Sequence, residues 1–310
     1  VFSMSPGEAR VIDPQQRVLL EHSLQVLPRD AGSVHGTRPT GVYLGAWSGD
    51  YADIMHNSPR ASSVFSLCAT GGCNMAGRLS FAFDLRGPCM AIDTACSSGL
   101  VATHLASRGL QNDECHTSLV AGANIICSIA FSGRIAEAGM TSPRGRSHAF
   151  DSRADGYARG EACVAMTLCR LIIQPDVNNG SWRGAAVQQD GRSASLTAPN
   201  GSAQRMLLRA ALAAAERTPA QVHAVQVHGT GTALGDPIEV ESLAAAVLRE
   251  SPYAVAAGGV KANAGHAEPA AGLTGLVMLQ AALQGARSLP NAQLRAVSYT
   301  HLTLPTKFVV

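Results

Sequence analysis

Short apolar segments with strand character alternate with helical segments along most of the chain, and this alternation limits the fold more than any other feature. Strand-like segments lie at residues 41–46, 89–92, 118–126, 164–168, 185–187, 222–227 and 255–261. Helical patterns lie around residues 75–79, after residue 97, at 203–217, from Pro237 and after Pro269. This spacing predicts an α/β fold with parallel sheets that helices cover on both faces. The order runs twice, which hints at a duplicated half.

The composition suits a protein with a large core. Of the 310 residues, 46% are hydrophobic and 15% are charged. This hydrophobic content is enough to form the core of one domain or of two closely fused ones. The 24 Lys and Arg against 22 Asp and Glu give a net charge of +2, so we expect neither a nucleic-acid surface nor an acidic tail. The eight cysteines form no C-x-x-C pair and are predicted to be reduced, mostly buried thiols in the cytoplasm.

Neither a leader nor a membrane span is predicted. The most apolar run, residues 269–285, is interrupted by Thr274, Gln280 and Gln284, which favours a buried helix over a membrane span. The sequence opens at Val1 without a basic and then apolar leader. Because it begins in the middle of an element, we expect a fragment.

Two segments near the start of the chain predict the first residues of helices, and one later segment predicts a long polar loop. Ser5-Pro6-Gly7-Glu8 and Asp13-Pro14 each place a capping side chain before a proline, which predicts helices that start there. Residues 139–161 are dense in Arg, Asp and Gly. A loop of this length is more often functional than a plain connection.

Cys96 lies between a predicted strand and a predicted helix. Cys89-Met90-Ala91-Ile92 predicts a short buried strand. Beyond Cys96, helical spacing places one apolar set on one face and a polar set on the other: Leu100, Val101, His104 and Leu105 against Thr103, Ser107 and Arg108. Backbone N–H groups at a helix start favour an anion and lower the pKa of a thiol there, as a nucleophile requires. The alternative is a small buried cysteine that packs like alanine.

Two histidines follow later strands. The strand ending at Val227 is followed by His228-Gly229-Thr230-Gly231-Thr232, and Asp236-Pro237-Ile238-Glu239 then has the pattern of a helix cap with a capping box. Val260-Lys261 leads to Gly265-His266 in the same way. Ligands bind at the carboxyl ends of strands in open α/β sheets. Either histidine alone could be a core or loop residue, but together with Cys96 they predict a thiol–imidazole site.

Two rival sites are weaker. Gly229 and Gly231 resemble a phosphate loop but lack the Gly-Lys-Ser/Thr ending and the dinucleotide spacing. His223 and His228 could share a metal ion only on a helix, whereas the alternation of Val222, Val225 and Val227 indicates a strand. We therefore expect neither a metal nor a nucleotide cofactor.

The motifs together resemble the β-ketoacyl synthase (ketosynthase) domain of polyketide synthases, of the thiolase-like family. The matching stretches occur in the family's order over nearly the whole chain: Met4-Ser5-Pro6, Asp13-Pro14-Gln15-Gln16-Arg17, Asp93-Thr94-Ala95-Cys96-Ser97-Ser98, Phe150-Asp151, Ala154-Asp155-Gly156-Tyr157, Arg159-Gly160-Glu161, His228-Gly229-Thr230-Gly231-Thr232, Gly235-Asp236-Pro237, and Lys261 with Gly265-His266. A chalcone-synthase-like Cys-His-Asn site or the second catalytic cysteine of a thiolase is not found at these positions.

The resemblance implies a layered αβαβα fold from two duplicated halves, here residues 1–164 and 165–296. It implies that Cys96 takes an acyl chain from the phosphopantetheine of an acyl carrier protein. His228 and His266 would promote CO2 loss from a malonyl thioester and stabilise the enolate, which attacks the acyl group to give a 3-oxoacyl thioester in polyketide or fatty acid biosynthesis. The Cys96 backbone N–H would be one oxyanion donor, and the supporting residues would be Lys261, Thr230, Thr232, Asp236 and Glu239.

The resemblance also implies a homodimer that works with acyl carrier protein and acyltransferase domains in the cytoplasm. Compared with the family, the first strand before Val1 and the closing loop that carries the second oxyanion donor are absent, and Ala162 replaces a usual glycine. We expect residues 297–310 to be a non-native, adapter-derived tail. Two other functions stay open: a Cys/His acyltransferase that does not condense, and a catalytically silent ketosynthase-like partner.

Overall fold

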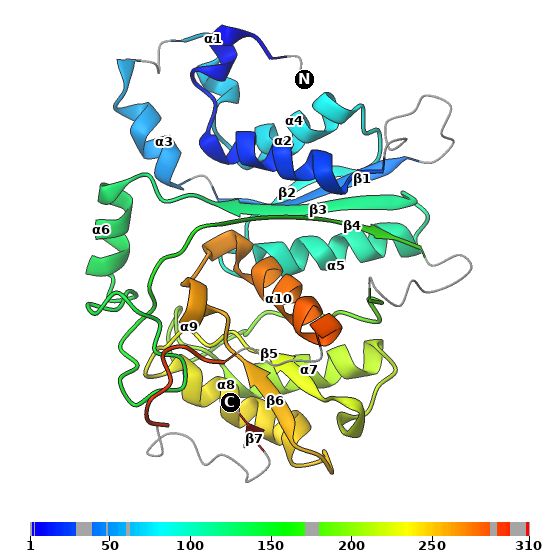
Figure 1. Cartoon of the computed structure of the whole chain (residues 1–310), viewed down its shortest axis with the longest axis vertical. Helices are drawn as coiled ribbons and strands as arrows, with labels where there is room; N and C mark the ends of the chain where they lie inside the picture. The colour runs from blue at the N-terminus through cyan, green and yellow to red at the C-terminus, as the bar shows by residue number, and fades with distance from the viewer. Residues whose placement is uncertain are drawn as a thin grey trace. The chain divides into compact units, whose positions relative to one another are not determined.

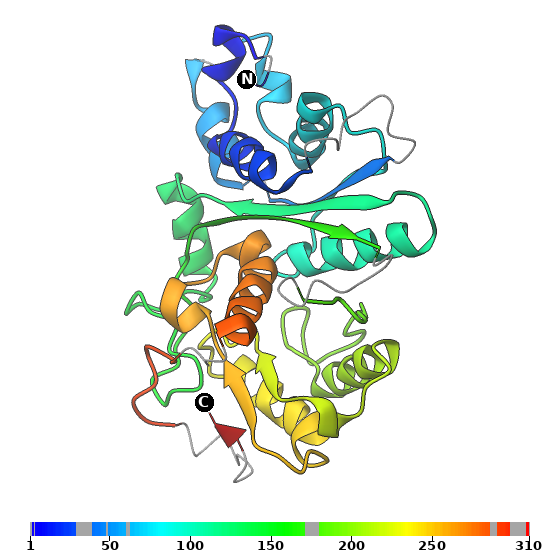
Figure 2. The same cartoon turned by 45° about the vertical axis from the view of Figure 1, so that its right-hand side comes forward.

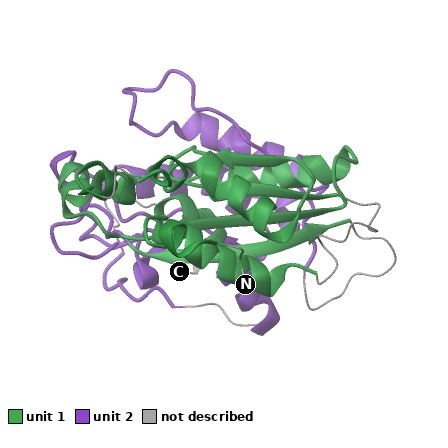
Figure 3. Ribbon diagram, turned by 90° about the horizontal axis from the view of Figure 1, so that it is seen from above, with its two compact units in different colours: residues 1–135, 160–173, 267–274 green, residues 136–159, 174–266, 275–310 purple. Residues whose placement is uncertain are grey.

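A computed structural model describes residues 2, 4–28, 39–47, 49–59, 63–170, 180–285 and 290–297, and the backbone of 308–309. The chain divides into two compact units, coloured in Figure 3. Unit 1 comprises residues 1–135, 160–173 and 267–274, and unit 2 comprises residues 136–159, 174–266 and 275–310. The predicted division at residue 164 into two duplicated halves stays a prediction.

Unit 1 is built on a four-stranded sheet in the order β2-β1-β3-β4. Its strands are β1 (Thr40–Gly45), β2 (Cys89–Ile92), β3 (Thr117–Asn124) and β4 (Ala162–Cys169). The pairs β1–β2 and β1–β3 are parallel, whereas β4 is antiparallel to β3. The parallel arrangement is therefore confirmed for three of the four strands.

Helices cover both faces of this sheet (Figures 1 and 2). α2 (Pro14–Val26) and α4 (Gly72–Phe83) lie on one face, and α5 (Ser98–Gln111) lies on the other. The alternation of strand side chains explains the two cores. Val42 and Leu44 pack with Leu19 and Leu79 toward α2 and α4, whereas Tyr43 packs with α5.

Shorter elements complete unit 1. They are α1 (Pro6–Ala9), α3 (Gly49–His56), η2 (Ser66–Cys68) and η5 (Glu268–Ala270), while α6 (Ile129–Glu137) and α10 (Ala271–Gly285) contribute residues to both units. The two predicted helix starts are confirmed. Ser5 Oγ accepts the Glu8 N–H before α1, and the Asp13 carboxylate accepts the Gln15 N–H before α2.

Unit 2 contains a three-stranded parallel sheet, β5-β6-β7. Its elements are α7 (Gly201–Ala214), η3 (Pro219–Gln221), β5 (Ala224–Gln226), α8 (Gly235–Leu243), the π-helical turn η4 (Ala244–Leu248), β6 (Val255–Gly258), α9 (Lys261–Ala264) and β7 (Phe308–Val309). Val240, Leu243 and Val247 form its core with Val255 of β6 and Phe150. The predicted loop at 139–161 is confirmed, since these residues form only turns and isolated bridges.

Three sequence expectations about packing are wrong. β2 is exposed over three of its four residues, not buried, because it is an edge strand that pairs only with β1 among the described strands. The free cysteines are mostly exposed, and of the eight only Cys115 is fully buried. In α5 the buried face carries small residues such as Ala102, Thr103 and Ala106, whereas Leu100 is 43% exposed. Close helix–sheet packing explains this face, because small side chains let the helix approach β1 and β3.

Two element assignments also differ from prediction. Residues 185–187 form no strand, and within the described ranges no other strand lies beside them to supply a ladder of hydrogen bonds. The strand predicted for 255–261 ends at Gly258, and Lys261 begins α9.

The last described residues pair with other parts of unit 2. Val297 forms an isolated bridge with Asp151, and Phe308–Val309 pair with β6, while 298–307 and 310 lie outside the described residues. An adapter origin of residues 297–310 stays a prediction. Within the described residues, no helix combines the length and the apolar character needed to cross a bilayer.

Candidate active site

Cys96 lies in the turn between β2 and α5 of unit 1. β2 ends at Ile92 and α5 begins at Ser98, so the thiol is carried two residues before the first helical residue. This confirms the predicted strand-to-helix turn. Cys96 is half-buried, which leaves part of the residue accessible to a reagent.

The backbone of this turn is held by contacts within residues 93–98. The Ser98 hydroxyl accepts the Thr94 N–H at 2.9 Å and donates to the Ala95 carbonyl at 2.6 Å, while the Asp93 carboxylate accepts the Ala95 N–H at 3.0 Å. Ala95 has φ of 53°, a left-handed conformation that costs roughly 1–2 kcal/mol for a residue other than glycine. Residues with such strained backbone angles occur mostly at functional sites, where the surrounding contacts maintain the conformation.

Gly99 allows the start of α5 to pack closely. A Cβ at this position would lie 2.7 Å from Leu273 Cγ and 3.0 Å from the Pro269 carbonyl oxygen. Both contacts lie within unit 1. Any larger residue at this point would push the first turn of α5, and therefore Cys96, away from its neighbours.

His228 and His266 lie together in unit 2. His228 follows β5, and His266 follows α9. Their rings meet edge to face, with centroids 5.7 Å apart and planes at 89°. His266 is 4% exposed, whereas His228 is an exposed residue. The structure therefore brings together the two predicted histidines.

Lys261 is the residue that organises His228. Its Nζ donates to the His228 carbonyl oxygen at 2.6 Å and lies 3.3 Å from His228 Nδ1. The lysine is 4% exposed, so its charge is poorly screened. If the ammonium donates to Nδ1, the proton of the neutral imidazole must lie on Nε2.

Both imidazoles are held in the neutral form. Burial, followed by the positive charge of Lys261, lowers the pKa of His228 to about 3. Burial, then Lys261 and His228, lowers the pKa of His266 to about 2. His228 is an exposed residue, and the Lys261 ammonium lies 3.3 Å from its Nδ1. Neutral rings can each offer one N–H donor at neutral pH.

Asp236 and Glu239 support the loop after β5, but not as the predicted capping box. Leu234 precedes α8 without a side-chain cap. The Glu239 carboxylate instead accepts the backbone N–H groups of His228 and Gly229, and Asp236 accepts those of Gly231 and Phe150. The prediction was wrong because distant backbone amides bind these carboxylates. Burial raises the pKa of both groups, while these bonds oppose the shift.

The remaining supporting residues lie in the same loop. Thr230 Oγ1 and Thr232 Oγ1 are 3.0 Å apart, and Thr232 Oγ1 accepts the Gly235 N–H at 3.1 Å. The contacts of two glycines and of His228 bear on the rival sites. The N–H groups of Gly229 and Gly231 serve protein carboxylates instead of a phosphate, and the Lys261 ammonium disfavours a metal ion at His228.

Tyr157 and Ala158 lie next to the histidines but were not predicted as site residues. Tyr157 packs on His266 with ring centroids 4.8 Å apart, and the Ala158 carbonyl accepts the His266 N–H at 2.7 Å. The only sequence signal was the motif Ala154-Asp155-Gly156-Tyr157 within the long loop.

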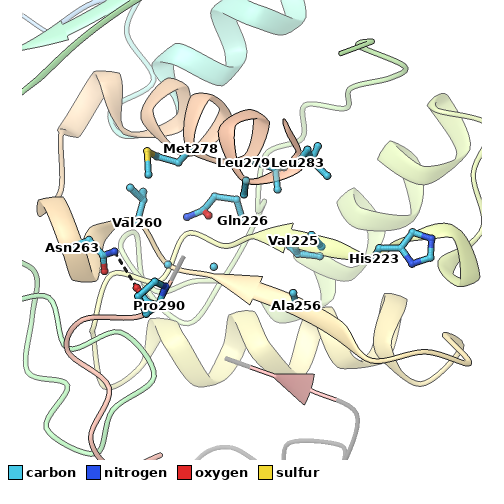
Figure 4. A pocket seen from close by; sticks show the side chains of 14 residues that line it. His223, Val225, Gln226, Ala256, Val260, Asn263, Met278, Leu279, Leu283 and Pro290 are labelled. Atoms are coloured by element: carbon cyan, nitrogen blue, oxygen red, sulfur yellow. Dashed lines mark hydrogen bonds between the residues drawn. The ribbon is translucent and has the colours of Figure 1, made fainter. Parts of the chain in front are cut away.

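One cavity of unit 2 is separate from this pair of histidines. It measures about 350 Å³ and lies between α10 and the strands β5 and β6, with Met278 and His223 in its walls (Figure 4). Gln226 lies in this space, and its buried Nε2 has no hydrogen-bond partner among the described residues. Neither His228 nor His266 lines the cavity.

Comparison with known proteins agrees with these features. Residues 1–172 match the family model "Beta-ketoacyl synthase, N-terminal domain", and residues 180–295 match "Beta-ketoacyl synthase, C-terminal domain". Among curated relatives, a phenolphthiocerol/phthiocerol polyketide synthase of Mycobacterium tuberculosis (strain CDC 1551 / Oshkosh) is 42% identical over 305 residues. That match covers 94% of this chain and 16% of the relative.

Two solved ketosynthases have similar structures. The ketosynthase from module 6 of the bacillaene synthase of Bacillus subtilis 168 matches with a TM-score of 0.84 and 31% identity, over 96% of this chain and 52% of its own. The oxazolomycin ketosynthase domain of Streptomyces albus JA3453 matches with a TM-score of 0.87 and 30% identity, over 99% and 56%. The chain thus spans about half the length of these structures and has their thiolase-like fold. It belongs to the β-ketoacyl synthase family, as a ketosynthase domain of the polyketide synthase type.

Proposed function

We propose that this domain catalyses decarboxylative Claisen condensation, with Cys96 as the nucleophile and His228 and His266 as donors to the enolate oxygen. In the first half-reaction, the Cys96 thiolate attacks the thioester of an acyl chain carried on the phosphopantetheine of an acyl carrier protein. The acyl–sulfur bond to the carrier breaks, a new thioester forms on Cys96, and the carrier thiol leaves with a proton. The left-handed turn at Ala95 and the adjoining helix start support this role for Cys96.

In the second half-reaction, a malonyl carrier thioester loses CO2. The electron pair of the broken C–C bond forms an enolate, whose carbon attacks the acyl–Cys96 carbonyl. The Cys96 thiolate then leaves, and the product is a 3-oxoacyl thioester two carbons longer. Donors aimed at a developing oxyanion commonly make the largest catalytic contribution.

The observation that carries this proposal is the edge-to-face pair of neutral imidazoles beside buried Lys261. Two N–H donors from adjacent rings suit a single enolate oxygen. Because both rings are neutral, neither forms an ion pair that would stabilise the malonyl carboxylate. This favours the loss of the carboxylate as CO2. Lys261, Glu239 and Asp236 support the loops, and the Cys96 backbone N–H would serve the oxyanion of the acyl group.

The partners follow from the same chemistry. We propose that acyl carrier protein and acyltransferase domains supply the two thioesters in polyketide biosynthesis, with fatty acid biosynthesis as the alternative. We also propose a homodimer in the cytoplasm. The exposed edge strand β2, including Met90 at 37% exposure, supports a self-association surface, because an unpaired strand edge favours pairing with another chain.

The test is a condensation assay on the full-length protein with acyl and malonyl carrier-protein thioesters. Release of CO2 in step with a 3-oxo product supports condensation. Acylation of Cys96 without CO2 release would favour a non-condensing acyltransferase, and failure of an iodoacetamide probe to label Cys96 would favour a silent partner.

The His266→Ala variant makes this assay specific. We expect it to acylate Cys96 at close to the wild-type rate but to lose about 100-fold or more in CO2 release, the usual cost of an oxyanion donor. His223→Ala is the matched control, because His223 lies at the opposite end of β5 from His228. Equal CO2 release by both variants would contradict the role given to His266.

A further inference from the structure

Tyr157 lies directly against one of the two imidazoles. The ring centroids of Tyr157 and His266 are 4.8 Å apart, with the planes at 59°. His228 contacts the same imidazole edge to face at 5.7 Å. The three aromatic side chains form one continuous group within unit 2.

The backbone around Tyr157 connects the two histidine loops. The Gly156 N–H donates to the Gly231 carbonyl at 3.0 Å, in the loop that follows His228. The Ala158 carbonyl accepts the His266 N–H at 2.7 Å. The residues on either side of Tyr157 therefore hydrogen-bond to the two histidine loops: Gly156 to the loop after His228, and Ala158 to His266 itself.

This segment is itself tightly anchored. Tyr157 N–H donates to the Met140 carbonyl at 3.1 Å, and its carbonyl accepts the Ser142 N–H at 2.9 Å. Gly156 has φ of 132°, and a Cβ there would lie 2.6 Å from Ser142 N. Only glycine fits this close approach, so these contacts fix the backbone that carries the Tyr157 ring.

Backbone contacts cannot fix the plane of the His266 ring. The χ2 torsion of histidine is broad and roughly two-fold, so the imidazole can turn while its backbone stays in place. Contacts on the ring itself must set the direction of the N–H group. Tyr157 and His228 both make such contacts, each through its own ring.

We propose that Tyr157 is a positioning residue whose ring holds the His266 imidazole in the orientation that directs its N–H group at the enolate oxygen. This inference rests on the proposed condensing function and adds a residue to it. The ring is the active part, so phenylalanine should replace tyrosine, whereas leucine should not.

The experiment compares Tyr157→Leu and Tyr157→Phe with the wild type in the full-length protein. Cys96 acylation, CO2 release and 3-oxo product are measured separately, together with kcat and KM for the malonyl thioester. Tyr253→Leu is the matched control, because Tyr253 makes a Tyr–His ring contact of 6.1 Å with His223, away from His228 and His266. A thermal melt establishes that each variant folds.

We expect Tyr157→Leu to lower kcat for CO2 release about 10- to 100-fold, since a displacement of about 1 Å at a reacting group can cost about 100-fold. Its KM should stay within about threefold, and the rate of Cys96 acylation within about twofold, because only an interaction of the transition state is lost. Tyr157→Phe and Tyr253→Leu should stay within about threefold of the wild type in all three steps.

Three results would overturn the inference. They are wild-type CO2 release by Tyr157→Leu, an equal loss of acylation and CO2 release in that variant, and a Tyr157→Phe variant as slow as Tyr157→Leu. If the wild type and Tyr253→Leu acylate Cys96 but release no CO2, the proposed function itself fails and the role of Tyr157 falls with it.

Discussion

The Cys96 turn of unit 1 and the histidine loops of unit 2 are held in place in opposite ways. The hydrogen bonds that shape residues 93–98 run within that segment. The loops after β5 and α9 depend on partners much further along the chain, since Lys261 binds His228 across 33 residues and Asp236 binds Phe150 across 86. Local hydrogen bonds thus shape the Cys96 turn, although the adjoining Gly99 packs on distant Leu273, whereas the positions of the imidazole donors depend on the completed fold of unit 2.

The largest effect is expected at the nucleophile. Cys96→Ala removes the atom that carries the acyl chain, so condensation should fall by about 1,000-fold or more. Formation of the 3-oxo thioester measures it, and the exposed Cys169 supplies a control in Cys169→Ala. Because the turn is held by its own residues, the melting temperature should not change. A large loss of stability in Cys96→Ala would break the contrast between the two regions.

The second prediction concerns a long-range contact of unit 2. The buried Asp151 carboxylate accepts bonds from the Arg153 side chain and from the Arg295 and Ala296 N–H groups. Asp151→Asn should therefore lower the free energy of unfolding by about 2–4 kcal/mol, measured by urea denaturation. Asp84→Asn, which breaks an exposed pair with Arg86, should cost less than about 1 kcal/mol.

The pH dependence of the Asp151 contribution has a definite sign. Burial acts to raise the pKa of Asp151, but the bonds from Arg153, Arg295 and Ala296 outweigh it and lower the pKa well below its ordinary value. The stabilisation is therefore fully present above the ordinary pKa of about 3.9 and is lost as the pH falls through the lowered value in the folded state. Equal acid sensitivity of Asp151→Asn and the wild type would contradict this account.

A smaller effect is expected at Lys261. Lys261→Met removes the charge beside His228, so the pKa of His228 should rise from about 3 toward the ordinary value of about 6.5. An imidazolium would then stabilise the malonyl carboxylate and slow its loss as CO2. At pH 5.5, one unit below that ordinary value, we expect up to about a tenfold lower rate than in Lys261→Arg, with the difference narrowing as the pH rises. Parallel pH–rate profiles for the two variants would show that the charge of Lys261 does not act on His228.

The smallest effect is expected within the Cys96 turn. Ser98→Ala removes the hydroxyl that accepts the Thr94 N–H and donates to the Ala95 carbonyl. The free energy of unfolding should fall by about 1 kcal/mol, and Cys96 acylation should slow more than CO2 release. Ser97→Ala, which removes an exposed hydroxyl that donates to the Thr94 carbonyl at 2.8 Å, should cost less than Ser98→Ala. If Ser98→Ala slowed only CO2 release, the local account of the turn would be wrong.

Sequence reasoning succeeded where neighbouring residues decide the structure. The caps at Ser5 and Asp13 and the turn at Cys96 each depend on contacts within a few residues. It failed where distant residues decide. Asp236 and Glu239 have a capping pattern, yet backbone amides of other loops bind them, and the buried face of α5 is determined by close packing against the sheet. Tyr157 was part of a recognised motif, but its contact with His266 joins segments far apart in the chain, so no local pattern could reveal it.

The interleaving of the units has a consequence for how this polypeptide matures on the ribosome. Leu273, fully buried beside Tyr43 and Ala102, belongs to the core of unit 1 although it is encoded near the end of that unit's sequence. At translation rates of about 5–20 residues per second, the earlier strands wait on the order of tens of seconds for this side chain. Until Leu273 is synthesised, the core of unit 1 lacks one of its buried side chains. Folding of unit 1 therefore finishes late in synthesis and does not simply proceed from the amino terminus onward.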